Sequence, residues 1–230
     1  MPIMDFSIKI LKVIKIGGVD VWITETTRNI WIIMGMLTVF AIVARVNLKK
    51  TVDVPSGLQN AVETAVEAFD KFLLDSAGEK LMFLGNWYFM VFAFIIVSNL
   101  SGLIFLRPPT ADWTVTFPLA FTTFVLIQGM GIKYRKGKFV KSLFEPSPIF
   151  FPLNVIGELA RPISLSFRLF GNILAGMILM SLLYAVTPLP VRFVIPIPLH
   201  MFFDLFAGVL QTYIFSILSL SFIGISASAE

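Results

Sequence analysis

The sequence contains no cysteine and only one histidine. Without cysteine the chain has no disulfide, thiolate metal site, iron–sulfur cluster or cysteine nucleophile. One histidine cannot build a multi-histidine metal centre, and no stretch matches a GxxxxGK(S/T) or GxGxxG phosphate-binding loop. These absences predict a protein that needs no cofactor and no metal, and that binds no nucleotide itself.

Charge is also scarce, since 14% of the 230 residues are charged and 57% are hydrophobic. A soluble domain usually carries about 25% charged residues, and a chain this short cannot hide so much apolar surface inside one globule. The composition excludes a water-soluble enzyme and a disordered tail. It predicts an all-α integral membrane protein, and the modest net charge of +4 indicates membrane topology rather than nucleic-acid binding.

Three apolar runs are candidate transmembrane helices: residues 30–46, 81–106 and 115–132. Each is close to the roughly 20 residues that cross the hydrocarbon core, and helices are the only sensible spanning structure for them. Between the first two runs, residues 58–74 alternate acidic and apolar positions at helical spacing. This pattern predicts an amphipathic helix lying on the membrane surface; a helix packed on a soluble partner is the alternative.

The last third of the chain differs from the rest. Residues 150–187 and 198–226 are two apolar segments that would form helices of about 57 Å and about 44 Å. Because the hydrocarbon core is only about 30 Å thick, such helices must break or tilt steeply. The proline-rich stretch from Pro188 to Arg192 predicts a turn between them. We expect a long, tilted helical hairpin that forms the functional module.

Lysine and arginine counts predict the orientation. The two loops after the first and third spans hold ten basic residues, against six in the N-terminal segment and the opposite loops. This excess predicts an N-terminus outside and a C-terminus in the cytoplasm. We therefore expect the chain to divide into an outer-side segment, 1–28; transmembrane helices with the surface helix, 29–149; and the long tilted hairpin, 150–230, as the functional module.

Arg168 lies in the middle of the first long helix, with no acidic residue within one helical turn. Placing such an arginine in a membrane costs about 2.5–3.5 kcal/mol on insertion scales, and its guanidinium stays charged. It is suited to meet a carboxylate from another helix, and Asn172 lies one turn away on the same face. The alternative is an arginine that snorkels to a headgroup or pairs structurally.

The second long helix carries His200, Asp204 and Gln211 on one narrow face if each residue advances by about 100°. Titratable groups in file on an intramembrane helix predict a proton or ion path, and Asp204 indicates an aqueous cavity reaching in from outside. His200 is equally compatible with an interfacial position. Glu158 lies three residues before Arg161, so it is either a structural ion-pair partner or a lining residue of an inner access route.

With these residues in view, the chain resembles the a subunits of the F-type rotary ATP synthases. The most specific string runs from Ser164 to Asn172 (SLSFRLFGN) and is followed by Ala175-Gly176. The segment Pro108–Thr116 looks like the family's loop before its third span, and Gln211 matches the family's glutamine on the last helix.

The resemblance implies an ion-translocating stator with two aqueous half-channels, in which Arg168 faces a ring of c subunits and couples H⁺ flow to ring rotation. It implies that Asn172, Gln211 and Asp204 line the ion path, that a b-subunit peripheral stalk is a further partner, and that the protein resides in a bacterial cell membrane. Na⁺ as coupling ion is the alternative, and a self-contained channel or transporter is a more distant one. Met177 departs from the family, which often has a titratable residue there, and His200 is expected to compensate.

Overall fold

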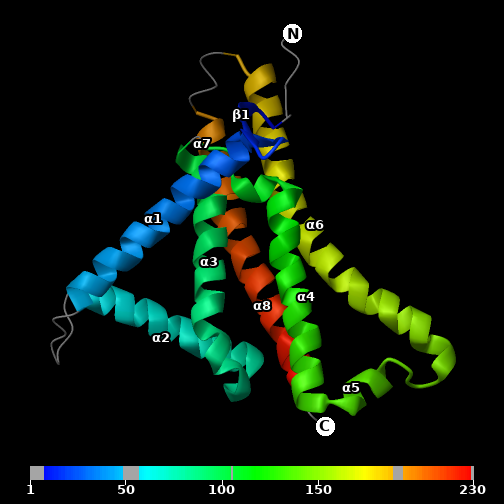
Figure 1. The fold of residues 1–230 in the computed structure, drawn as a ribbon. Helices are drawn as coiled ribbons and strands as arrows, with labels where there is room; N and C mark the ends of the chain where they lie inside the picture. The colour runs from blue at the N-terminus through cyan, green and yellow to red at the C-terminus, as the bar shows by residue number, and fades with distance from the viewer. Residues whose placement is uncertain (1–7, 49–56, 105, 189–193, 229–230) are drawn as a thin grey trace.

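The computed structural model describes residues 8–48, 57–104, 106–188 and 194–228. Within these ranges five helical segments are long and apolar enough to cross a membrane: 25–46, 79–104, 113–135, 148–186 and 196–227. The chain is therefore a helical, multi-pass membrane protein, and the five spans predicted from the sequence are confirmed. In Figure 1 segments 79–104, 113–135 and 196–227 run together along the bundle, whereas 25–46 and 148–186 lean away from them toward opposite sides.

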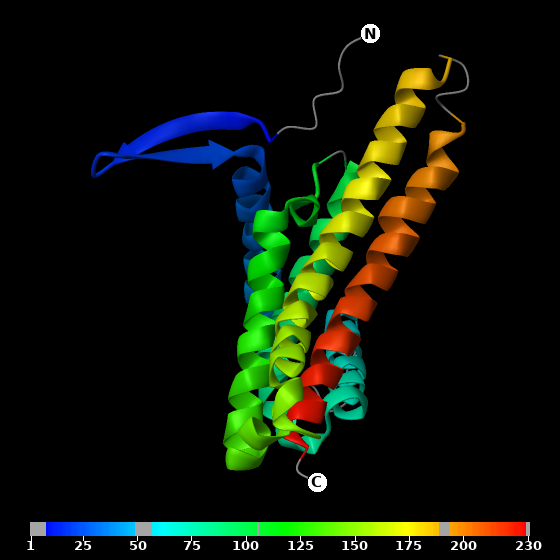
Figure 2. The same ribbon diagram turned by 90° about the vertical axis from the view of Figure 1, so that its right-hand side faces the viewer.

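The N-terminal segment contains a β-hairpin that sequence reasoning did not anticipate. Strands β1 (Ile10–Ile16) and β2 (Val19–Thr24) pair in antiparallel register. Gly17 and Gly18 connect them with positive φ angles of 59° and 85°, a conformation that costs glycine little. Helix α1 (Glu25–Leu48) begins at the residue after β2, and Figure 2 shows the hairpin projecting sideways from the N-terminal end of α1.

Asp112 fixes the start of α1 to the start of α4 (Trp113–Arg135). Its carboxylate caps α4 by accepting hydrogen bonds from the Thr114 backbone N–H at 3.0 Å and the Thr114 hydroxyl at 2.7 Å. The other carboxylate oxygen accepts a 3.0 Å bond from the buried Thr26 hydroxyl on α1. Nearby, the Asn29 side chain donates a 2.9 Å bond to the Arg107 carbonyl oxygen. This cluster ties the loop before α4 to the start of α1.

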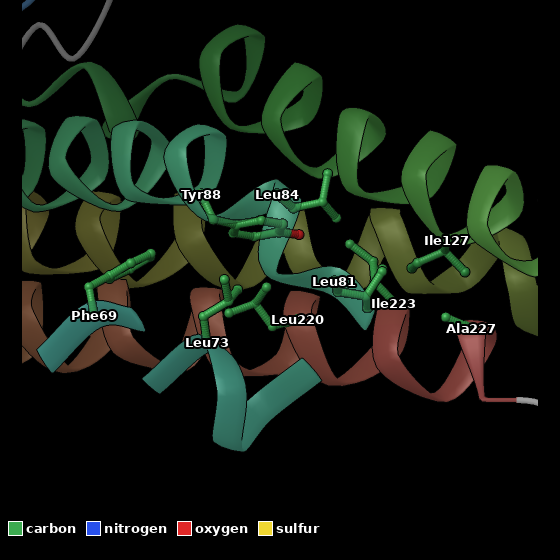
Figure 3. Close-up of a cluster of buried hydrophobic side chains, with 9 residues drawn as sticks. All are labelled: Phe69, Leu73, Leu81, Leu84, Tyr88, Ile127, Leu220, Ile223 and Ala227. Atoms are coloured by element: carbon green, nitrogen blue, oxygen red, sulfur yellow. The ribbon is translucent and has the colours of Figure 1, made fainter. Parts of the chain in front are cut away.

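The predicted amphipathic helix forms as α2 (Leu58–Ala77), followed by the 3₁₀ segment η1 (Glu79–Leu84) and helix α3 (Gly85–Leu100). Helix α2 packs on α8 and α3 through Phe69 and Leu73, and Figure 1 shows it running obliquely from the far end of α1 to the lower end of α3. Phe69 and Leu73 therefore face the other helices, whereas Val66, one turn earlier, is exposed. Figure 3 shows the resulting core, made of Phe69, Leu73, Leu81, Leu84, Tyr88, Ile127, Leu220, Ile223 and Ala227.

The last two spans form the long helical pair that the sequence predicts. Helix α6 (Phe151–Val186) has 36 residues, which corresponds to about 54 Å. The second span consists of α7 (Pro196–His200), a π-helical turn (Met201–Phe206) and α8 (Ala207–Ala227). Both views show α6 inclined to α4 and running beside the second span. Of the predicted turn at Pro188–Arg192, residues 189–193 lie outside the described residues.

Short elements complete the chain between these helices. They are the 3₁₀ segments η2 (Ser101–Ile104), η3 (Pro109–Ala111) and η4 (Pro148–Phe150), and the short helix α5 (Gly137–Ser142). Segment η2 contacts the π-helical turn, and η3 contacts α3 and α6. These contacts bring the loop between α3 and α4 against the long helical pair, where the candidate site lies.

Candidate functional site

Helix α6 buries one face and leaves Arg168 on its flank. The buried positions recur every three or four residues and pack toward α4 and α8: Pro162, Leu165, Ser166, Leu169, Ile173, Gly176 and Met180. Arg168 falls outside this stripe and its side chain is exposed. Within the described ranges, its guanidinium has neither a hydrogen-bond nor an ion-pair partner. The site therefore presents a fixed positive charge that another polypeptide can contact.

A cavity of about 230 Å³ lies between α6 and α8 beside Arg168. On α6 it is lined by Gly157, Arg161, Ser164 and Arg168, among others, and on α8 by Leu218 and Phe222. The α6 residues lie between Arg168 and the helix N-terminus, so the cavity extends toward the end of the bundle where the C-terminus is located (Figure 1). Arg168 therefore lies at one end of the run of α6 residues that line this cavity.

Asn172 and Gln211 meet between the two long spans. The Asn172 side-chain amide on α6 donates a 2.7 Å hydrogen bond to the Gln211 Oε1 atom on α8. Gln211 is buried, with 2% of its surface exposed, whereas Asn172 is exposed on the same helix as Arg168. The pair fixes the spacing of α6 and α8 one turn beyond the arginine.

The C-terminal end of α6 and the start of the second span share a row of hydrogen-bonded titratable groups. The Tyr184 hydroxyl on α6 lies 3.0 Å from His200 Nε2, and His200 Nδ1 lies 2.5 Å from Asp204 Oδ2. The Asp204 carboxylate is so close to η2 that a Cβ atom added to Gly102 would lie 3.1 Å from it. These hydrogen-bonded groups therefore reach from Tyr184 on α6 across the second span to Gly102 in the loop after α3.

A buried polar cluster anchors α8 to α3 through residues that follow Asp204 in the sequence. The Asn99 amide donates to the Gly208 carbonyl oxygen at 2.9 Å and to the Thr212 hydroxyl at 3.1 Å. The Thr110 hydroxyl donates to Asn99 Oδ1 at 2.7 Å. Gly208 permits this close approach, since a Cβ atom at this position would lie 3.1 Å from that of Asn99 and would push it away by a few tenths of an ångström.

Glu158 lies near the N-terminus of α6 and is bonded on both carboxylate oxygens. Oε1 is 2.7 Å from Arg161 Nη1, and Oε2 accepts a 3.1 Å hydrogen bond from Gln128 on α4. The structural pairing expected from the i, i+3 spacing is therefore present. Arg161 also places its guanidinium 5.4 Å from the Phe222 ring of α8, at the wall of the cavity described above.

Of the six residues chosen from the sequence, the structure joins His200 with Asp204 and Asn172 with Gln211. Glu158 and Arg168 are about 15 Å apart along α6. Sequence reasoning missed Tyr184, Asn99 and Gln128. Each is a polar residue inside an otherwise apolar span, and that signal alone could have identified them.

The chain matches the family model described as "ATP synthase A chain" over residues 28–224. It is 36% identical to the sodium-ion-specific ATP synthase subunit a of Propionigenium modestum, over 87% of this chain and 73% of the relative. It is 32% identical to the ATP synthase subunit a of Moorella thermoacetica (93% and 94% covered) and to that of Desulfosudis oleivorans (84% and 83% covered). The chain therefore belongs to the ATP synthase A chain family and is a subunit a, the non-catalytic, ion-translocating stator subunit of the ATP synthase membrane sector.

Proposed function

We propose that Arg168 is the stator cation that meets the ionised carboxylates of a rotating c-subunit ring. The observation that carries this proposal is that Arg168 is exposed, faces a cavity and has no partner among the described residues. An arginine cannot be deprotonated in practice, so it stabilises an ionised carboxylate beside it and repels a stray cation. Both effects prevent an ion from crossing directly between the two sides.

Two half-channels would lead to this arginine from opposite ends of the bundle. The cavity lined by Arg161, Ser164 and Arg168 supports an inner half-channel. The bonded groups Tyr184, His200 and Asp204 support an outer half-channel, because a carboxylate at membrane depth needs water or a partner. His200 then compensates for Met177, where many family members have a titratable side chain. Asn172 and Gln211 separate the two paths beside Arg168.

Family membership places the chain in a complex with the other ATP synthase subunits. The c ring would contact the exposed flank of α6, and a b-subunit peripheral stalk would hold the stator in place. The basic loops predict an N-terminus outside and a C-terminus in the cytoplasm of a bacterial plasma membrane. The membrane potential then supplies about 2.3 kcal/mol per charge per 100 mV to drive rotation.

We propose H⁺ as the coupling ion. The bonded chain from Tyr184 through His200 to Asp204 supports this choice, since such groups pass protons between adjacent hydrogen-bonded atoms. Na⁺ is the second candidate, because the relative from Propionigenium modestum is sodium-ion specific. In that case Asp204 would serve as an oxygen ligand along the path.

ATP-driven ion pumping by the reconstituted complex tests the proposal. Wild type and Arg168→Ala are compared with and without Na⁺, after confirming equal assembly. We expect acidification that is lost in the variant and does not depend on Na⁺. Pumping that requires Na⁺ would keep the stator role and change the ion. Normal pumping by Arg168→Ala would show that Arg168 is structural and would refute the proposal.

A further inference from the structure

Arg161 and Arg168 line the same cavity from the same flank of α6. Seven residues separate them, which corresponds to about two turns and about 10 Å along the helix. Both guanidiniums stay charged at any accessible pH. A cation that enters this cavity would meet two fixed positive charges unless one of them is neutralised.

The structure neutralises Arg161 and leaves Arg168 free to act. Glu158 holds Arg161 at 2.7 Å, and Gln128 holds the second oxygen of the same carboxylate from α4. The contact of Arg161 with the Phe222 ring ties the pair to α8 as well. Three helices therefore fix this one ion pair, although an isolated i, i+3 pair on a helix surface stabilises little.

Glu158 is less exposed than Arg161, as expected for a residue that balances the charge of the arginine from behind. The Glu158 side chain is 18% exposed and that of Arg161 is 38% exposed. The carboxylate is thus held behind the guanidinium, which is the member of the pair that lines the cavity. Glu158 reaches the cavity through its charge rather than by direct contact.

We infer that Glu158 is an electrostatic positioning residue of the inner half-channel, whose charge cancels that of Arg161 and leaves Arg168 as the uncompensated cation among the described lining residues. This inference rests on the proposed function, in which the cavity carries the ion. A bare unit charge about 10 Å away at an effective dielectric constant near 20 lowers the occupancy of a monovalent cation roughly tenfold. Removing Glu158 alone should therefore obstruct the path without touching Arg168.

The test compares Glu158→Gln, Glu158→Asp, Arg161→Gln and the double variant E158Q/R161Q in the reconstituted complex. Initial rates of ATP-driven ion pumping are divided by the amount of assembled complex. We expect E158Q to pump roughly tenfold more slowly than wild type. The double variant, which balances the charge without the pair, should recover to within about threefold of wild type, as should E158D, which keeps the charge. Arg161→Gln should lose less than E158Q.

A double variant that pumps no better than E158Q would overturn the inference, because the pair would then be a structural brace whose loss costs the same however the charge is balanced. If E158Q does not assemble, the pumping rate of the double variant alone tests the inference. The double variant loses the ion pair but keeps the same net charge as wild type. Arg168→Ala is measured in parallel. An active Arg168→Ala would refute the proposed function, whereas an inactive one with an impaired double variant would refute only the role of Glu158.

Discussion

The Asn172 amide on α6 donates its hydrogen bond to Gln211 on α8 at 2.7 Å, one helical turn beyond Arg168. Gln211 is almost completely buried, so its oxygen has no water to replace this donor. Interhelical hydrogen bonds in membranes contribute about 0.6 kcal/mol on average and up to about 2 kcal/mol. The bond therefore contributes little to the stability of the whole chain. Because it joins α6 to α8 one turn from Arg168, we expect it to matter mainly for the placement of that side chain.

Replacement of Gln211 by leucine tests this placement. We expect Gln211→Leu to leave the complex assembled but to lower coupled ATP synthesis several-fold, because α6 can then shift relative to α8 beside Arg168. Asn172→Leu in the Gln211→Leu background should cause little additional loss, since both changes remove the same bond. The measurement is ATP synthesis by inverted membrane vesicles for the two single variants and the double. Fully additive losses would show that the two residues act independently.

Tyr184→Phe removes one hydroxyl from the chain that joins His200 and Asp204. A net hydrogen bond contributes about 0.5–1.5 kcal/mol, so we expect the ion-pumping rate to fall roughly two- to tenfold. Tyr213→Phe is the matched control, because Tyr213 is an exposed tyrosine of α8 whose ring packs on Phe72. A Tyr184→Phe complex as active as this control would mean that the outer path does not use the hydroxyl.

Gly102→Ala places a methyl group against the Asp204 carboxylate. The added Cβ would lie 3.1 Å from the carboxyl carbon, which is tight enough to displace the carboxylate by a few tenths of an ångström. We expect slower ion pumping with normal assembly. Gly129→Ala in α4 serves as control, since no described atom lies within 4 Å of its added Cβ. Equal pumping by both alanine variants would show that Asp204 tolerates the shift.

Asp112→Ala should destabilise the complex rather than the ion path. The change removes the cap of α4, which contributes about 1 kcal/mol, and leaves the buried Thr26 hydroxyl without its acceptor, which costs about 1–3 kcal/mol. Thermal disassembly of the purified complex should shift to lower temperature. Asp112→Asn keeps one acceptor oxygen, which can still cap α4 through Thr114, and should shift less. An equal shift for both variants would indicate that the cap contributes little and that the second carboxylate oxygen or the negative charge stabilises this region.

The membrane spans could be predicted because their signal is local. Apolar length alone located residues 81–106 and 115–132 to within three residues of the observed ends. The N-terminal hairpin was missed, although Gly17-Gly18 between alternating apolar residues is a hairpin signal. Its strands of seven and six residues are too short to be found by a search for apolar runs of membrane-spanning length.

The site was predicted in its residues but not in its contacts. An advance of about 100° per residue, which assumes a regular α-helix, predicts His200, Asp204 and Gln211 on one face. The structure has a π-helical turn at Met201–Phe206, which includes Asp204 and which this extrapolation did not consider. In the structure Asp204 bonds to His200 and packs on η2, and Gln211 bonds to Asn172. Partners such as Tyr184 and Gln128 come from helices distant in sequence, so periodicity within one segment could not reveal them.

The length of α6 has a geometric consequence for any partner that moves in the plane of the membrane. If its roughly 54 Å lay wholly within about 30 Å of hydrocarbon, the two ends of the helix would be displaced sideways by about 45 Å. Each position along this tilted helix would then differ from the others both in its depth and in its lateral position in the membrane plane. Glu158, Arg168 and Tyr184 would then lie at three depths and at three successive positions in the membrane plane, so a partner group that moves sideways at one depth would approach the helix closely at only one of them.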